Sequence, residues 1–257
     1  MMALADVVSG VPPELFVLIV AVFVVAGLVK GVVGLGLPTI SMALLAIFMP
    51  PAQAAALLIV PSLITNVWQA RPLHTLMLLL RRIGGMQLGI GAGTLAGALV
   101  LGAPAGAWAS VSLGVALVAY AAWGLLGAPL AIPVRMEKWL GPLVGALTGL
   151  ITAATGVFVV PAVPYLQMLG LGRDGLVQAM GISFTVSTVA LAVGLWVNDS
   201  YSAGAAGASV VMLLPALVGM SAGQLLRKSL SPEVFKTCLL SCLALLGIYQ
   251  VIGQFLA

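Results

Sequence analysis

One lysine stands inside a long apolar stretch of this sequence, GLVKGVVGLGLPTISMALL, which runs from Gly27 to Leu45. Lys30 lies about 16 residues into the first apolar segment, or about 24 Å along a helix at a rise of 1.5 Å per residue. A lysine at that depth costs at least ~2.5 kcal/mol on insertion scales. Two interpretations are open: an ion pair or snorkelling side chain, and a site that neutralises an anion. We favour the anion, because the apolar segments hold no Asp or Glu away from their ends.

The residues after Lys30 supply the other parts of an anion site. Gly34 and Gly36 lack side chains, so backbone N–H groups can approach a ligand closely there. Pro38 suits the first turn of a following helix, and Thr39 lies next to it. The N-terminus of a helix has free N–H donors and a partial positive charge, which favour anions. We therefore expect Lys30 and this Gly-rich break to bind a small anionic substrate together.

Polar side chains inside the apolar segments gather near this break and near a second Gly-rich break around Gly156. Each Ser or Thr alone is more typical of helix packing or of a bond to its own helix, and a membrane Gln or Asn often bonds a neighbouring helix. Their concentration near the two breaks favours substrate binding instead. The further predicted substrate-binding residues are Gln53, Asn66, Gln69, Thr152, Thr155, Gly156, Gln178, Ser183 and Thr185.

The composition places these residues in a membrane protein. Of 257 residues, 62% are hydrophobic and 6% are charged, whereas a soluble domain has about 25% charged residues. An enzyme is disfavoured, because the spans hold no paired carboxylates, no metal-ligand cluster and no Ser/His/Asp set, and His74 lies alone in a basic loop. We expect no catalytic residue, metal, cofactor or nucleic-acid partner. The net charge of +4 comes from basic residues in the short loops between spans, which membrane topology explains.

Pro, Gly and charged residues divide the chain into ten apolar segments. Those at about 37–49 and 158–170 are too short to span a bilayer comfortably. Each begins near a proline after a Gly-rich break, so each is predicted to be the returning half of a hairpin or broken helix. The other eight are predicted at about 14–36, 51–70, 83–101, 106–127, 139–156, 175–197, 207–226 and 233–256.

Nine of the ten basic residues fall on one face if each hairpin returns the chain to the side it came from. They are Arg71, Arg81, Arg82, Arg135, Lys138, Arg173, Arg227, Lys228 and Lys236. The opposite face receives Asp6, Glu14 and Asp199. The positive-inside rule then places the basic loops in the cytoplasm and both termini outside, in a multi-pass protein of the inner (plasma) membrane.

The two halves of the chain resemble each other, which predicts repeats at 1–128 and 129–257 within one integral membrane domain. Gly27 and Gly31 match Gly145 and Gly149, Gln53 matches Gln178, and Gly93 and Gly97 match Gly219 and Gly223. Each half holds five segments, an odd number, so the second half should be inverted relative to the first. The predicted fold is an all-α polytopic membrane protein of two inverted-topology repeats of five hydrophobic segments, each with a Gly-rich broken helix or hairpin.

At the two breaks the sequence resembles the TauE/SafE (TSUP) family of membrane transporters, whose repeats each open with a Gly-rich run followed by a proline. The copies here are GVVGLGLP from Gly31 and GLITAATGVFVVP from Gly149. The stretch LLIVPSLITNVWQA, from Leu57 to Ala70, is similar to a further family motif. The resemblance covers nearly the whole chain. It implies exporter-type transport of a small sulfur-containing anion, either sulfite or an organosulfonate such as sulfoacetate, with other small organic anions as further candidates.

The expected mechanism is alternating access, in which the two hairpins meet at the midplane and one bundle rocks against the other. Export could run uncoupled, because an inside-negative potential favours anion exit by ~2.3 kcal/mol per charge per 100 mV. Protons are a further candidate partner, since a desolvated lysine can titrate. The alternatives are an anion channel with the same selectivity elements and a transporter of small carboxylates.

Overall fold

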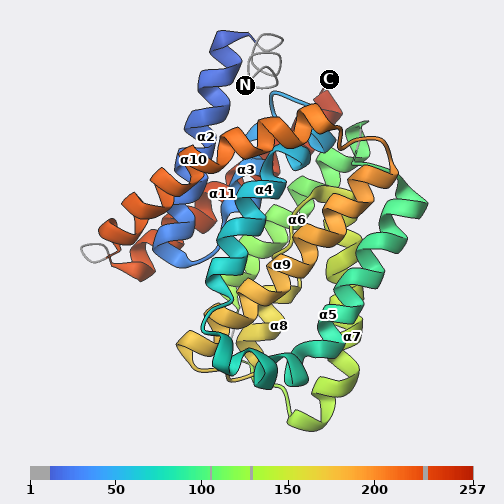
Figure 1. Ribbon diagram of the computed structural model, residues 1–257, viewed down its shortest axis with the longest axis vertical. Helices are drawn as coiled ribbons and strands as arrows, with labels where there is room; N and C mark the ends of the chain where they lie inside the picture. The colour runs from blue at the N-terminus through green and yellow to red at the C-terminus, as the bar shows by residue number, and fades with distance from the viewer. Residues whose placement is uncertain (1–11, 105, 128–129, 228–230, 257) are drawn as a thin grey trace.

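The computed structural model describes residues 12–104, 106–127, 130–227 and 231–256, and within these ranges the chain forms ten helices and no strand (Figure 1). Seven of the helices are long and apolar enough to cross a bilayer, which agrees with the predicted all-α membrane protein. The helices are α2 (Pro13–Val33), α3 (Leu37–Leu45), α4 (Pro51–Gln69), α5 (Leu73–Leu101), α6 (Gly106–Leu126), α7 (Val134–Thr155), α8 (Ala162–Met168), α9 (Arg173–Val197), α10 (Ala203–Leu226) and α11 (Pro232–Leu256).

The helices follow the ten predicted segments, but four of them start elsewhere than predicted. α8 begins at Ala162 rather than at 158, and α10 begins at Ala203 rather than at 207. α3 and α8 have nine and seven residues, which is too short to span a bilayer, as predicted. α5 begins at Leu73 rather than at 83, and α7 begins at Val134 rather than at 139. The prediction treated the charges there as loop residues. In the structure Arg82 donates to the Glu137 carboxylate at 2.6 and 2.9 Å, so both charges are paired and both helices continue past the apolar segments.

Glycine ends both α2 and α7, the first described helix of each half. α2 ends at Gly34, whose φ is 81°, and Gly36 follows with a φ of 121°, values that side chains rarely allow. The Gly34 N–H donates to the Lys30 carbonyl at 2.8 Å, which closes the helix. α7 ends in the same way at Gly156, where φ is 70° and the N–H donates to the Thr152 carbonyl at 2.8 Å. A Gly-rich break therefore precedes each short helix.

The helices of the two halves pack in crossed pairs. α2 packs along α10, α5 along α7, α4 along α9 and α6 along α11. Figure 1 shows α10 crossing α2, with α5 and α7 together at the opposite side. A Cβ atom at Gly27 would overlap the carbonyl oxygen of Ala216, and one at Gly145 would overlap that of Met86. Glycine thus lets these helices of opposite halves approach backbone to backbone.

These close contacts differ by one helical turn from two of the predicted glycine matches. Gly219 and Gly223 approach the backbone of α2 as Gly89 and Gly93 approach the backbone of α7. The predicted counterparts of Gly219 and Gly223 were Gly93 and Gly97, which lie one turn further along α5. Glycine recurs at every fourth position from 85 to 97, so neighbouring registers look alike in the sequence.

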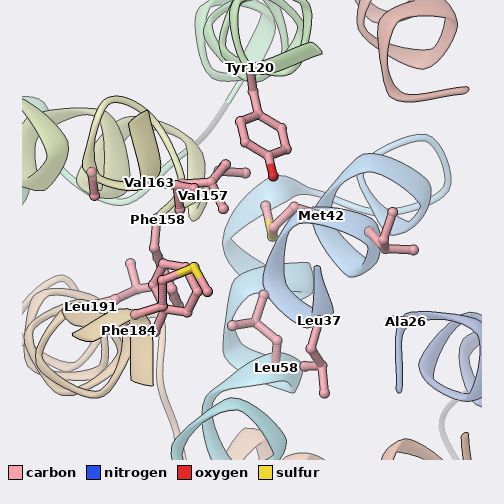
Figure 2. Packing of buried hydrophobic residues seen from close by; sticks show 14 of the residues in the cluster. Ala26, Leu37, Met42, Leu58, Tyr120, Val157, Phe158, Val163, Phe184 and Leu191 are labelled. Atoms are coloured by element: carbon pink, nitrogen blue, oxygen red, sulfur yellow. The ribbon is translucent and has the colours of Figure 1, made fainter. Parts of the chain in front are cut away.

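Apolar side chains fill the centre of the molecule between the two short helices. In Figure 2, Phe158, which precedes α8, and Phe184 of α9 lie together on one side, and Met42 and Leu37 of α3 lie apart from them toward the centre. All four side chains are less than 2% exposed. The two phenylalanine rings lie 6.2 Å apart at a tilt of 51°. Met42 also packs against Gly156, so α3 contacts the second break.

Charged residues separate toward the two ends of the α2, α4 and α10 helices. Arg71, Arg173 and Arg227 line one cavity where α4 and α10 end, and we call this the basic end. Asp199 lies by a second cavity at the starts of α2, α4 and α10, which we call the acidic end. Two residues of the predicted charge pattern, Lys228 and Asp6, lie outside the described residues.

Candidate functional site

A cavity of about 830 Å³ lies at the basic end, where the ends of α2, α4 and α10 meet the start of α9. Four basic side chains line it, those of Lys30, Arg71, Arg173 and Arg227. Asp174 is the single acidic residue among the described residues that line it. A cavity with this excess of positive charge raises the local concentration of anions.

Lys30 is the buried cation of the cavity, with 4% of its surface exposed. Its ammonium donates a hydrogen bond to Oδ1 of Asn66 on α4. Asn66 Nδ2 in turn donates to Oγ1 of Thr188 on α9 at 3.3 Å, and the Thr188 hydroxyl donates to the Phe184 carbonyl at 2.7 Å. Asn66 and Thr188 are fully buried. A neutral amide therefore positions the Lys30 amino group and supplies no negative charge to it.

In the part of the chain that the structure describes, no carboxylate lies within ion-pair distance of Lys30. Asp174 lines the same cavity but its side chain is exposed. A buried charge without a partner is costly, and buried charges are normally paired. The described residues thus offer no ion pair of the kind considered from the sequence, and an anion in the cavity would supply the missing charge.

Exposed arginines form the rim of the cavity, and one of them is held in place. The Arg71 guanidinium lies 4.4 Å from the ring centroid of Trp68, a cation–π contact. Gln178 Nε2 donates to the carbonyls of Ala70 and Pro72 at 3.0 and 2.7 Å. Gln178 lies on α9 and therefore anchors the turn that contains Arg71. These two bonds occupy the amide nitrogen of Gln178.

The first-half residues predicted for the site lie at different distances from the cavity. Gly34 and Gln69 line it. The Gln69 amide nitrogen donates to a carbonyl of α9 at 3.1 Å, while its oxygen has no partner among the described residues. Gly36, Pro38 and Thr39 are buried and are not among the lining residues. The first break therefore contributes Gly34 to the cavity wall, and the N-terminus of α3 lies behind it.

The second-half residues predicted for the site make other contacts. The hydroxyls of Thr152, Thr155 and Thr185 donate to carbonyls of their own helices at 2.7 to 2.8 Å. Ser183 accepts a hydrogen bond from a glutamine of α5 at 2.9 Å, and Gly156 packs on a methionine of α3. None of these residues lines the cavity that contains Lys30.

The site predicted from the sequence omitted the three arginines that line the cavity, and it omitted Thr188, which bonds Asn66. Arg71, Arg173 and Arg227 are explained there by membrane topology alone. The available signal was the shared face of the basic residues, because loops on one face can converge on one cavity. Gln53, by contrast, lies at the acidic end and lines a different cavity.

A family model described as Sulfite exporter TauE/SafE matches residues 19–250. Comparisons with curated proteins and with solved structures return no match. The matched range contains Lys30, both Gly-rich breaks and every described residue that lines its cavity. Seven long apolar helices agree with a family of multi-pass membrane transporters. The chain therefore belongs to the TauE/SafE family of sulfite exporter-type membrane transporters.

Proposed function

We propose that the protein exports a small sulfur-containing anion, either sulfite or an organosulfonate such as sulfoacetate, and binds it at Lys30. The observation that carries the proposal is a buried lysine, paired with a neutral amide, in a cavity that three arginines also line. The positive charge comes from the geometry of this chain. The sulfur of the substrate comes from family membership.

The charge balance of the cavity supports an anionic substrate. At an effective dielectric constant of about 20, a unit negative charge about 4 Å from an ammonium gains about 4 kcal/mol. A neutral substrate would leave Lys30 without compensation. A sulfite or sulfonate group also presents three oxygens, which lets it accept hydrogen bonds from several donors at once.

We further propose that residues 1–128 and 129–257 are inverted repeats of five segments within one membrane domain. The crossed packing supports this arrangement, because exchanging the halves exchanges the α2–α10 pair with the α7–α5 pair and leaves the α4–α9 and α6–α11 pairs unchanged. The positive-inside rule then places the basic end in the cytoplasm and both termini outside the inner membrane.

This orientation favours export. The cavity lies at the end that we assign to the cytoplasm, so the anion is captured from inside the cell. An inside-negative potential then drives its exit by ~2.3 kcal/mol per charge per 100 mV. We propose that the step is alternating access. A channel with the same selectivity elements is the alternative, and it would not show saturation at low substrate concentration.

Proteoliposomes test the function directly. Flux of sulfite, of sulfoacetate and of a small carboxylate is measured for the unchanged protein, for Lys30→Met and for Arg81→Ala. Lys30→Met removes the buried charge at similar side-chain length. Arg81→Ala removes an exposed charge that lines none of the described cavities, so it serves as the matched control.

The expected result is saturable flux of the sulfur anions that falls at least tenfold in Lys30→Met and stays within twofold in Arg81→Ala. Equal flux in Lys30→Met, with the protein monodisperse by size exclusion, would assign Lys30 a structural role. A preference for the carboxylate would replace the substrate class, and linear flux without saturation would favour the channel.

A further inference from the structure

A second cavity of about 580 Å³ lies at the acidic end, and the proposed function does not use it. The starts of α2, α4 and α10 form its walls, together with the loop before α10. Its lining includes Ile19, Gln53, Leu57, Met212 and Asp199. Most of the wall is apolar, and Asp199 is the single charged residue among the described residues that line it.

The same three helices line the cavity at Lys30, at their opposite ends. α2 and α4 each pack against α3 and against α10, so the space between α2 and α4 is bounded by α3 on one side and by α10 on the other. The two cavities therefore lie at opposite ends of the same three helices, α2, α4 and α10. We call the cavity at the acidic end the outer cavity.

Side chains at helical spacing connect the two cavities along each wall. Positions three and four apart share one face of a helix. On α2 the series is Ile19, Phe23, Ala26 and Lys30; on α4 it is Leu57, Pro61 and Thr65; on α10 it is Met212, Ala216 and Met220. The first member of each series lines the outer cavity and the last lines the cavity at Lys30.

The layer between the cavities is thin and closed. Phe23 of α2 and Ala216 of α10 are fully buried, and Pro61 of α4 is buried as well. Leu57 lines the outer cavity and Thr65 lines the cavity at Lys30. The helix rises by about 12 Å between these two residues at 1.5 Å per residue. The barrier along α4 is therefore about one helical turn on either side of Pro61. A barrier of this length separates two cavities that together reach both ends of α4.

The helix is weakened at this layer. Pro61 has no N–H to donate to the Leu57 carbonyl. Ser209 of α10 replaces that bond: its hydroxyl donates to the Leu57 carbonyl at 2.8 Å and accepts from the Val60 N–H at 2.9 Å. Bending α4 at Pro61 therefore breaks side-chain bonds to Ser209 rather than a continuous helical ladder.

We propose that the outer cavity is the second mouth of the anion path that begins at Lys30, and that the layer of Phe23, Pro61 and Ala216 is the barrier that opens between them. The proposal rests on the proposed function and assigns its exit route. The charges agree with outward release, because the basic cavity attracts the anion while Asp199 disfavours it at the outer mouth.

Cysteine modification tests this route in the full-length chain. Cys238 and Cys242 are both exposed, so they are first replaced by serine. Ala208→Cys and, separately, Ala205→Cys then place a thiol on the wall of the outer cavity. Val210→Cys is the matched control, since it lies on the same turn of α10, is 56% exposed and does not line that cavity.

The probe is 2-sulfonatoethyl methanethiosulfonate, an anionic thiol reagent that does not cross lipid. Mass spectrometry measures the extent of modification, and the same liposomes report anion flux. We expect both wall cysteines to be modified and flux to fall at least tenfold, while flux in Val210→Cys stays within twofold. Flux before modification must match that of the serine background.

Two results would overturn the route alone. Complete modification of Ala208→Cys or Ala205→Cys with unchanged flux would show that the outer cavity lies off the path. Failure of the reagent to reach either thiol during active transport would show that the cavity does not open to water. Absence of anion flux in the unmodified protein would instead refute the proposed function, and the route with it.

Discussion

Replacing Asn66 by aspartate tests the central claim that the charge of Lys30 is left for the substrate. The Lys30 ammonium donates to Asn66 Oδ1, and aspartate offers an oxygen at the same position. Asn66→Asp therefore keeps the shape and the hydrogen bond while adding one negative charge. The bond from Asn66 Nδ2 to Thr188 is lost, but the Thr188 hydroxyl keeps its bond to the Phe184 carbonyl.

The substitution is expected to lower affinity strongly and to leave folding stability nearly unchanged. A carboxylate about 6 Å from a bound monoanion repels it by about 2.8 kcal/mol at an effective dielectric constant of about 20. That energy corresponds to a loss of roughly 100-fold in affinity. The lost hydrogen bond to Thr188 costs about 1 kcal/mol of folding stability, and the new ion pair with Lys30 offsets it. The variant should therefore fold normally and bind the anion poorly.

The assay is the KM for sulfite or sulfoacetate in proteoliposomes, with thermal unfolding in detergent measured in parallel. Asn66→Leu is the matched control, because it removes both hydrogen bonds without adding charge. We expect KM to rise about 100-fold in Asn66→Asp and much less in Asn66→Leu, with the lower melting temperature in Asn66→Leu. Equal KM values in the two variants would refute the electrostatic reasoning and leave Asn66 with a packing role.

Three further predictions follow from the cavities and the helix contacts. Arg173→Gln should raise KM several-fold and weaken its dependence on ionic strength, whereas Arg81→Gln at an exposed position outside the cavities should not; titration of flux against salt checks this. Asp199→Asn should lower the KM for anions supplied from the acidic end by about two- to threefold. Asparagine tolerates the positive φ of 52° at this position, so an unchanged KM would argue against an effect of Asp199 on the outer mouth. Gly27→Ala should lower the melting temperature, because its Cβ would overlap the backbone of α10, whereas Gly91→Ala meets nothing within 4 Å and should raise stability by up to about 1 kcal/mol; equal melting temperatures would contradict the close helix contact.

Local chemistry accounts for what could be predicted of the fold. Continuous apolar runs predict spans wherever the backbone must satisfy its own hydrogen bonds in lipid. Gly34 and Gly156 end helices in the left-handed conformation, so the two breaks could be located from Gly-rich runs followed by a proline. The starts of α5 and α7 could not, because the pairing of Arg82 with Glu137 joins residues 55 positions apart. The charges of Arg82 and Glu137 suggested loop residues, but because the two side chains form an ion pair, both segments are helical.

The sequence by itself determined the membrane class, the positions of the two breaks and the presence of a deep, unusual charge at Lys30, since composition and helical rise are local properties. Only the tertiary structure decided which polar residues share a site with it. Arg71, Arg173 and Arg227 converge on Lys30 from three separate parts of the chain, whereas Thr152 and Ser183, equally polar in sequence, bond elsewhere. The physical reason is that the neighbours of a side chain in a helical membrane protein are set by which helices pack together, and glycine contacts between the two halves decide that packing here.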